Sequence, residues 1–386
     1  MNERDPAPRF ASAPTTRVAA ALLACGWAAN HFVALLPAYR VQLDLTAAQI
    51  ASAFGVYACG LLPGLLRGGP LSDRRGRRAV LLPGGLVAVI GTLVLLLGRA
   101  HFAALLGGRL LVGLGAGAVF SAGSAWMLGL GGARASQQTG IALSLGFGLG
   151  PLASGAIGVV TGAPTAAPYL LLLPIVVAAL LAAASVTARS GGAPARADAP
   201  PPAADAQAPM PMAAFLAQVA PVAPWIFAFP SLSFVTFAGE VSRGSARAPL
   251  LVGAVAAVTL LAGALAPRVL RGATPALGLA VGAVGIFGGL AAASAGWFGG
   301  VLAAGVLLGV GHGTVLAAAL QLVAARVPDR VRGRYLGLTY ALAYVGFAVP
   351  LLLAWVTPVL GETRAVVTLG ALAAGLAVRE VRRARR

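Results

Sequence analysis

Residues 69–78 read GPLSDRRGRR, and they gather five charged side chains between two strongly apolar stretches. The stretch before them, ASAFGVYACGLLPGLL (51–66), and the stretch after them, AVLLPGGLVAVIGTLVLLL (79–97), carry no charge. Each belongs to an apolar run near the 20 residues that a helix needs to cross a hydrocarbon core of about 30 Å. We therefore predict a charged loop between two membrane-spanning helices.

Runs of the same kind recur along the whole chain of 386 residues, which is 59% hydrophobic and only 10% charged. A soluble domain carries about 25% charged residues, and the strands of a membrane β-barrel would alternate in polarity over about ten residues. The N-terminus is too charged for a cleaved signal peptide. The predicted fold is an all-α membrane protein. Its twelve expected spans are 18–38, 47–67, 79–98, 102–130, 138–162, 168–187, 213–238, 246–266, 275–293, 297–322, 335–356 and 365–380.

The net charge of +18 comes entirely from arginine, because the chain has no lysine. With the N-terminus placed in the cytoplasm, 22 of the 28 arginines fall in inner segments and five in outer loops, and Arg109 lies within a span. This bias is the positive-inside rule for a protein with both termini cytoplasmic. The charge therefore orients the protein in its lipid bilayer, and nucleic-acid binding is not expected.

The segment 188–212 is rich in proline and alanine, which predicts a flexible cytoplasmic linker. It separates residues 1–187 from residues 213–386, with six spans on each side. The stretch GPLSDRRGR (69–77) aligns with GALAPRVLR (263–271) at a shift of 194 residues. Two glycine triplets align with each other at a shift of 196 residues. The first triplet is Gly113, Gly115 and Gly117, and the second is Gly309, Gly311 and Gly313. We interpret the chain as an internal duplication that forms two six-helix pseudo-repeat bundles.

Three motifs resemble those of the major facilitator superfamily, and the resemblance spans essentially the whole chain. The stretch GPLSDRRGRR fits that family's pattern G-x-L-x-D-R-x-G-R-R, and RLLVGLGAG (109–117) is similar to its helix 4 motif. The stretch GFGLGPLASG (146–155) is similar to the helix 5 motif G-x-x-x-G-P-x-x-G-G of proton-driven exporters, although Ser154 replaces one glycine. The resemblance implies two bundles that rock around a central cavity.

Two groups of residues are predicted to control gating. A carboxylate at the inner surface is attracted to the positive N-terminal end of a helix, so we expect Asp73 to hold the inner gate shut against the helix that begins near Arg334. Gly69 and Gly76 would permit the close approach and the turn, and Arg74 and Arg77 complete this group. The alternative is that these arginines only orient the helix ends. The second group, which resembles a seal between the halves, is Gly146, Gly150, Pro151 and Gly155; plain close packing is its alternative.

Arg109 is the most costly residue to place, because a charge within a span costs roughly 2.5–3.5 kcal/mol. It lies about 10 Å from the outer end of its helix at 1.5 Å per residue, and Asn30 and His31 reach the same depth from the first helix. The family resemblance places these two helices side by side. We therefore expect Asn30, His31 and Arg109 to form a polar cluster that handles substrate or protons. The alternative is an Arg109 side chain that snorkels outward.

Further candidates for substrate or proton binding are mostly aromatic. His312 lies between two glycines and titrates near neutral pH, although a neutral histidine hydrogen-bonded between helices is an equal alternative. Apolar walls with a few polar groups suit a binding cavity. The side chains of that type that we select are Trp27, Trp225, Phe229, Ser233, Tyr340 and Tyr344. Each of them has helix packing or lipid contact as its alternative.

All ten acidic residues fall in tails, loops or span ends, which disfavours an organic cation as the substrate. We expect a secondary transporter that moves a small neutral or anionic organic compound, driven by protons in the direction of export. An uptake carrier for an organic anion and a non-transporting receptor or scaffold are the alternatives. No catalytic arrangement, metal-ligand spacing or nucleotide-binding loop is present, so neither an enzyme nor a cofactor is expected. The composition suggests a bacterial plasma membrane protein, and we expect it to act as a monomer.

Overall fold

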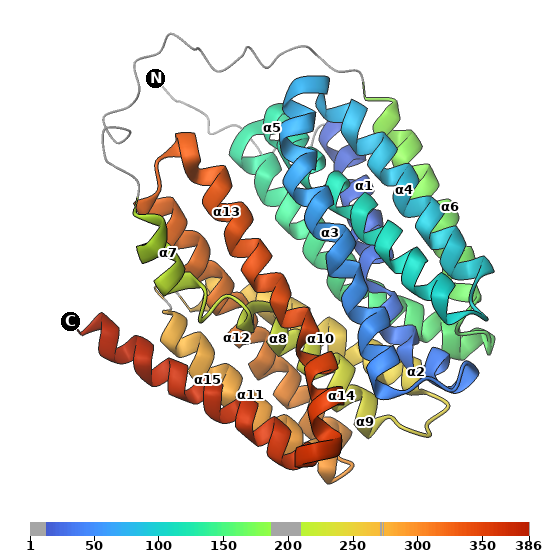
Figure 1. Ribbon diagram of the computed structural model, residues 1–386. Helices are drawn as coiled ribbons and strands as arrows, with labels where there is room; N and C mark the ends of the chain where they lie inside the picture. Colours follow the sequence, from blue (N-terminus) through green and yellow to red (C-terminus); the bar gives the residue numbers. More distant parts are fainter. Residues whose placement is uncertain (1–12, 187–209, 271, 273, 386) are drawn as a thin grey trace, which may run out of the picture.

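The computed structural model describes residues 13–186, 210–270, 272 and 274–385, and every regular element within them is a helix (Figure 1). Most of the predicted linker, residues 188–209, lies outside the described residues. The first part of the chain holds α1 (Ala13–Asn30), α2 (Phe32–Gln42), α3 (Ala47–Arg75), α4 (Arg77–Leu97), α5 (Phe102–Thr161) and α6 (Ala167–Ala184). The long α5 is two spans, because its backbone leaves helical geometry at Gly131 and Gly132.

The second part of the chain starts with α7 (Met212–Val219), α8 (Trp225–Ser231), a π-helix (Leu232–Phe237) and α9 (Ala238–Val241). Four long helices follow these short ones: α10 (Ala248–Val269), α11 (Pro275–Ser294), α12 (Phe298–Arg326) and α13 (Asp329–Tyr344). A 3₁₀ turn (Val345–Ala348) joins α13 to α14 (Val349–Leu360), and α15 (Glu362–Ala384) ends the described chain.

Ten helices among the described residues are long and apolar enough to span a membrane, and the all-α membrane fold is confirmed. The expected seventh span is not one continuous helix. Pro221 and Pro224 lie in the turn between α7 and α8, and proline interrupts a helix because it lacks the backbone N–H. The expected twelfth span is α15, which is helical but more polar, and it is not among the ten.

The two glycine triplets make equivalent contacts in the two parts of the chain. A Cβ on the first or third glycine of the first triplet would meet the backbone of α3, and one on the middle glycine would meet α4. In the second triplet the outer glycines press in the same way on α10, and the middle glycine presses on α11. The missing side chains thus let three helices approach closely in each bundle. This repetition of contacts is the structural form of the internal duplication.

Packing between the bundles differs at the two ends of the molecule. We call the end that holds residues 69–78 the Asp73 side, and the other end the Arg243 side. On the Arg243 side, α10 packs closely on the second span of α5, and a Cβ on Gly253 would lie 3.1 Å from the Leu152 Cα. On the Asp73 side, the ribbons of α13 and α3 diverge (Figure 1). The bundles are therefore joined most tightly on the Arg243 side.

Candidate functional site

Arg109 lies at the junction of α1, α3 and α5 and is only 1% exposed. Its Nη1 atom donates a hydrogen bond of 2.8 Å to the Ala29 carbonyl, and its Nε atom donates one of 3.4 Å to the Ala53 carbonyl. The guanidinium carbon lies 4.7 Å from the centroid of the Phe32 ring and 4.5 Å from that of the Tyr57 ring. These contacts combine hydrogen bonding with cation–π attraction. The side chain therefore points into the bundle and does not snorkel outward.

His31 is fully buried, and neither of its ring nitrogens has a hydrogen-bond partner among the residues that the structure describes. Its ring meets that of Tyr169 edge-on at 4.8 Å, and the Tyr169 hydroxyl is 2.9 Å from the Tyr39 hydroxyl. Arg109 is near enough to interact with His31 electrostatically. Buried polar atoms without partners are rare in folded proteins. The His31 nitrogens could therefore form hydrogen bonds with a ligand that enters this region.

Asn30 departs from the predicted cluster. Its Nδ2 atom donates a hydrogen bond of 2.8 Å to the Phe147 carbonyl on the second span of α5. The structure thus brings His31 and Arg109 into one buried region, whereas Asn30 fastens the first span to a different helix. Asn30 and His31, at the junction of α1 and α2, point to different partners because successive residues of a helical backbone lie about 100° apart.

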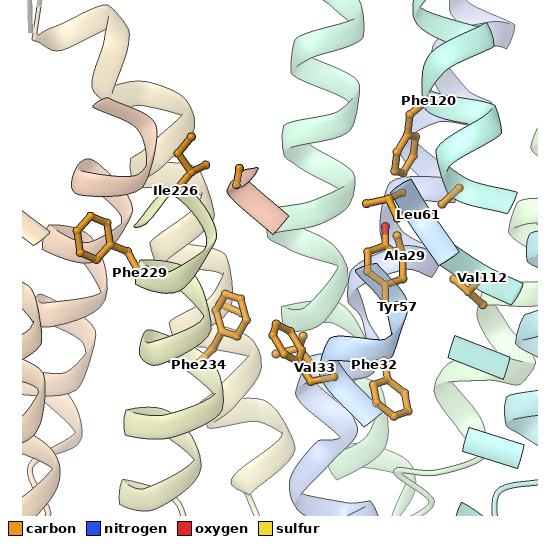
Figure 2. Close-up of a cluster of buried hydrophobic side chains, with 14 of the residues drawn as sticks. Ala29, Phe32, Val33, Tyr57, Leu61, Val112, Phe120, Ile226, Phe229 and Phe234 are labelled. Atoms are coloured by element: carbon orange, nitrogen blue, oxygen red, sulfur yellow. The ribbon is translucent and has the colours of Figure 1, made fainter. Parts of the chain in front are cut away.

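An aromatic bridge that sequence reasoning missed joins the two bundles near Arg109. Phe54 contacts Phe234 at 5.9 Å and stacks on Phe347 at 4.9 Å between ring centroids. Tyr57 also faces Phe347 at 6.5 Å between ring centroids, and its buried hydroxyl has no hydrogen-bond partner within the described part of the chain. In Figure 2, Phe234 reaches from one bundle toward Val33 of the other. The residues of this bridge lie in the second, seventh and eleventh predicted spans, and no local pattern distinguishes them from the other aromatic residues of those spans.

The helix 5 motif has two functions in packing. Gly146 and Gly150 press against α1, where a Cβ on Gly150 would lie 3.0 Å from the Trp27 Cα. Trp27 donates a hydrogen bond of 2.9 Å from Nε1 to the Ser154 hydroxyl, so the residue that departs from the family pattern has a partner. Trp27 is therefore a packing residue of its own bundle.

The other part of the motif meets the opposite bundle. A Cβ on Gly155 would lie 2.7 Å from the Pro249 carbonyl carbon, and one on Gly253 would lie 2.9 Å from that of Pro151. These reciprocal contacts press α5 and α10 together on the Arg243 side. Of the four predicted residues, Pro151 and Gly155 contact the other bundle, whereas the atoms nearest to a Cβ on Gly146 or Gly150 belong to α1.

The candidates on α8 and the π-helix lie mostly inside the second bundle. Phe229 is fully buried and its ring occupies the space beside Gly282 of α11, and in Figure 2 it points away from the first bundle. Trp225 packs on Phe229 at 5.5 Å. The Ser233 and Thr259 hydroxyls are 2.7 Å apart. The contacts cited for these three candidates lie within the second bundle.

His312 is tied to the backbone between helices. Its Nδ1 atom donates a hydrogen bond of 2.5 Å to the Ile226 carbonyl. A hydrogen bond between helices was one of the two alternatives expected for His312. Its ring lies 5.8 Å from Phe227, which stacks on Tyr344 at 4.6 Å. Tyr340 is 6.5 Å from Tyr344. The two tyrosines therefore belong to an aromatic surface continuous with Phe347.

The charged loop predicted at 69–78 is reduced to a single residue, because α3 continues to Arg75 and α4 begins at Arg77. Gly76 separates α3 from α4 and has a φ of +94°. A positive φ favours glycine, because glycine has no Cβ to clash with the backbone. Arg77 binds the Asp73 carboxylate at 2.5 Å and donates a hydrogen bond of 2.8 Å to the Ser72 hydroxyl. A Cβ on Gly69 would lie 3.0 Å from the Ser121 hydroxyl. Asp73 and Arg74 are exposed, so the carboxylate points into solvent beside Arg77.

A cavity of about 500 Å³ lies on the Arg243 side between the bundles. Its walls come from α2, the π-helix, the loop before α10 and α10 itself, and Arg40 and Arg243 both line it. Arg243 forms an ion pair with Glu240. The cavity combines apolar walls with guanidinium groups, a mixture that suits an amphipathic compound.

Among the described residues no group of three or more histidine, cysteine or acidic side chains could hold a metal ion.

The sequence profile of the Major Facilitator Superfamily matches residues 18–350. The chain therefore belongs to the Major Facilitator Superfamily.

Similar proteins agree with this assignment. The multidrug resistance protein MdtL of Escherichia coli is 36% identical over 85 residues, which are 22% of this chain and 22% of MdtL. MdtL of Shigella flexneri is 35% identical over 85 residues, with the same coverage. The chain thus aligns with about a fifth of the length of these curated relatives.

Solved structures share the fold over nearly the full length. A mutant peptide transporter POT superposes with a TM-score of 0.77 at 15% identity, covering 96% of this chain and 94% of that chain. A D-xylose-proton symporter superposes with a TM-score of 0.64 at 15% identity, covering 95% and 96%. The family assignment makes this chain a multi-pass membrane transporter, and the solved structures show that it shares their fold.

Proposed function

We propose that this protein is a secondary active transporter that exports a small neutral or anionic organic compound in exchange for protons. The observation that carries the proposal is the buried Arg109, whose guanidinium is held by backbone carbonyls and aromatic rings. Among the ion pairs of the described residues, none includes Arg109. A buried positive charge without an acidic partner favours an anion or an electron-rich neutral group.

Export is supported by two observations of different kinds. The chain resembles proton-driven exporters at residues 146–155, and part of it is similar to a protein named for multidrug resistance. The unpartnered nitrogens of His31 lie near Arg109 and give the proposed site a proton-binding group. In this scheme the substrate and the proton occupy the same buried layer at different times, so that one displaces the other.

Alternating access in this scheme requires two gates. Pro151 and Gly155 would form the gate on the Arg243 side, which is the tightly packed side of this structure. Asp73 would hold the opposite gate once it leaves Arg77 for the N-terminal end of α13. The exposed ion pair with Arg77 contributes at most about 1 kcal/mol, which makes it easy to exchange for another partner.

Domain organisation and orientation follow from the same proposal. Residues 1–187 and 213–386 would be the two rocking bundles, and residues 188–212 would join them in the cytoplasm. Both termini would be cytoplasmic in a bacterial plasma membrane. The path for substrate and protons lies between the bundles of one chain, which is consistent with a functional monomer.

A second candidate function is uptake of an organic anion. The cavity on the Arg243 side, with Arg40 and Arg243 in its walls, favours it because this cavity would be the first that an external anion meets. The two candidates differ in the direction of substrate flux that a proton gradient drives.

Reconstituted proteoliposomes with a panel of cationic, neutral and anionic amphipathic compounds test both candidates. We expect protons to move opposite to a neutral or anionic compound, and Arg109→Lys to lower the rate at least tenfold because a compact ammonium cannot reproduce the two hydrogen bonds and the ring contacts. His31→Gln should abolish coupled proton movement. Arg364→Lys, which is exposed on the Arg243 side, is the matched control. Symport of the anion would favour uptake, and a response confined to cations would overturn both candidates.

A further inference from the structure

A groove of about 320 Å³ runs along the outside of the first bundle, on the half toward the Asp73 side. Helices α3 and α4 form its two walls, and the first span of α5 forms its floor. The groove exists because α3 and α4 each pack mainly on α5 and much less on each other. Small residues of all three helices, including Gly68, Gly115 and Ala118, leave the floor open.

The chemistry of this groove is divided along its length. Its walls are apolar from Pro63 and Val87 toward the Asp73 side, where Arg67 and Arg75 border it. Both arginines are exposed. Neither forms an ion pair or a hydrogen bond with another described residue. The groove therefore has apolar walls and two positive charges without an ionic partner in the described part of the chain, Arg75 at its end on the Asp73 side and Arg67 about 12 Å from Arg75 along α3.

The dimensions of the groove match one leaflet of a bilayer. Pro63 and Arg75 are twelve residues apart on α3, which corresponds to about 18 Å at 1.5 Å per residue. Half of a hydrocarbon core of about 30 Å is about 15 Å. Arg75 is the last residue of α3, and Arg67 lies about two helical turns before it. If the end of α3 meets the membrane surface, the Arg67 side chain is long enough to reach toward that surface.

We propose that this groove is a binding site for one anionic phospholipid of the inner leaflet. One acyl chain lies along the floor over Gly115 and Ala118, and the phosphate lies between Arg67 and Arg75. Charge complementarity selects the occupant, because a zwitterionic lipid offers the same acyl chain but no net charge to the two arginines. Guanidinium groups also suit phosphate through paired hydrogen bonds.

The site adjoins residues 69–78 but includes none of the gating candidates within them. Arg75 is the residue before Gly76, so a lipid phosphate bound to it holds the end of α3 at the membrane surface. Arg74 and Arg78 of the same loop do not line the groove. Specific binding is thus distinguishable from the general attraction of a basic surface for an anionic membrane.

Native mass spectrometry of the full-length protein, purified in detergent and mixed with phosphatidylglycerol or phosphatidylcholine of equal chain length, tests the proposal. Each arginine near an anionic lipid surface is worth roughly fivefold in affinity. We expect the unaltered protein to retain phosphatidylglycerol at least tenfold better than phosphatidylcholine, and Arg67→Gln/Arg75→Gln to reduce the preference to about twofold. Arg78→Gln/Arg382→Gln removes the same charge elsewhere on this side and should preserve the preference.

A second variant tests the groove itself and keeps the proposal falsifiable if the double variant does not fold. Ala79→Trp fills the groove while both arginines remain, and it should lower the retention of phosphatidylglycerol by at least fivefold. If the two double arginine variants lost the preference for phosphatidylglycerol to the same extent, the proposal would be overturned in favour of attraction by general surface charge. Displacement of the lipid by inorganic phosphate at equal concentration would also overturn it, because the site would then bind the phosphate group alone.

Discussion

At the scale of single residues, Ser154 explains how the chain tolerates a departure from its family pattern. The motif at 146–155 has serine where a glycine is usual, and the structure gives this serine the indole N–H of Trp27 as a partner. Ser154 is fully buried, so its hydroxyl would be costly without a hydrogen bond. The exchange therefore adds a polar link between α1 and α5 at a position where glycine would give close packing only.

Ser154→Ala should lower the free energy of unfolding by about 1 kcal/mol, because it removes the hydrogen bond and leaves the Trp27 N–H buried without a partner. Thermal unfolding in detergent measures the change. A double-mutant cycle with Trp27→Phe should give a coupling energy of about 0.5–1.5 kcal/mol. Additive effects of the two substitutions would contradict the proposed link.

At the scale of elements, the contact between the second span of α5 and α10 decides which side of the molecule is closed. Gly155 and Gly253 each place a bare backbone against the carbonyl group of a proline on the other helix. Helices that meet through glycine approach closely and gain dispersion contacts over a long interface. A single added side chain therefore changes the distance between two whole helices.

Gly155→Val should force α5 and α10 apart and open the Arg243 side, because a Cβ there would overlap the Pro249 carbonyl group. We expect a cysteine introduced at Val252 to react with a membrane-impermeant maleimide at least fivefold faster in this variant. Gly140→Val, on the same span but with open space around it, is the matched control. Equal labelling rates in both variants would show that this contact does not close the molecule.

At the scale of the whole molecule, the two bundles meet through an aromatic bridge and a glycine-mediated helix contact, and they separate toward the Asp73 side. Transport by alternating access requires a second arrangement in which these contacts break and others form. Asp73 has no role in closing the present arrangement, since its carboxylate binds Arg77 of the same loop.

Asp73→Asn should shift the population toward the present arrangement, because the other one would lose the attraction between Asp73 and the N-terminal end of α13. Cross-linking of Phe54→Cys to Phe234→Cys by a short bismaleimide reports this arrangement, since the two native rings are 5.9 Å apart. The exposed Cys59 is replaced by serine to remove background labelling. We expect faster cross-linking and at least fivefold slower transport in Asp73→Asn. Asp44→Asn is the control, and unchanged rates in Asp73→Asn would refute the lock.

The site was only partly predictable. Arg109 stood out because a charge in a span is rare, and Gly76 because it follows a dense run of charges. Phe54 and Tyr57 gave no such signal, because aromatic residues are common in membrane helices and their importance depends on what faces them. Phe229 was predicted to line the binding cavity because it is aromatic, yet it packs inside its own bundle.

The sequence by itself determined the membrane class, the helical fold, the duplication and the family motifs. Each of these depends on local properties, namely the length of apolar runs, the spacing of glycines and the placement of arginines. Only the tertiary structure decided which side of the molecule is closed, which half of the helix 5 motif meets the other bundle, and that Arg109 is held by carbonyls of α1 and α3. These features depend on contacts between helices distant in sequence, and such contacts are set by the rotation and tilt of each helix in the packed bundle.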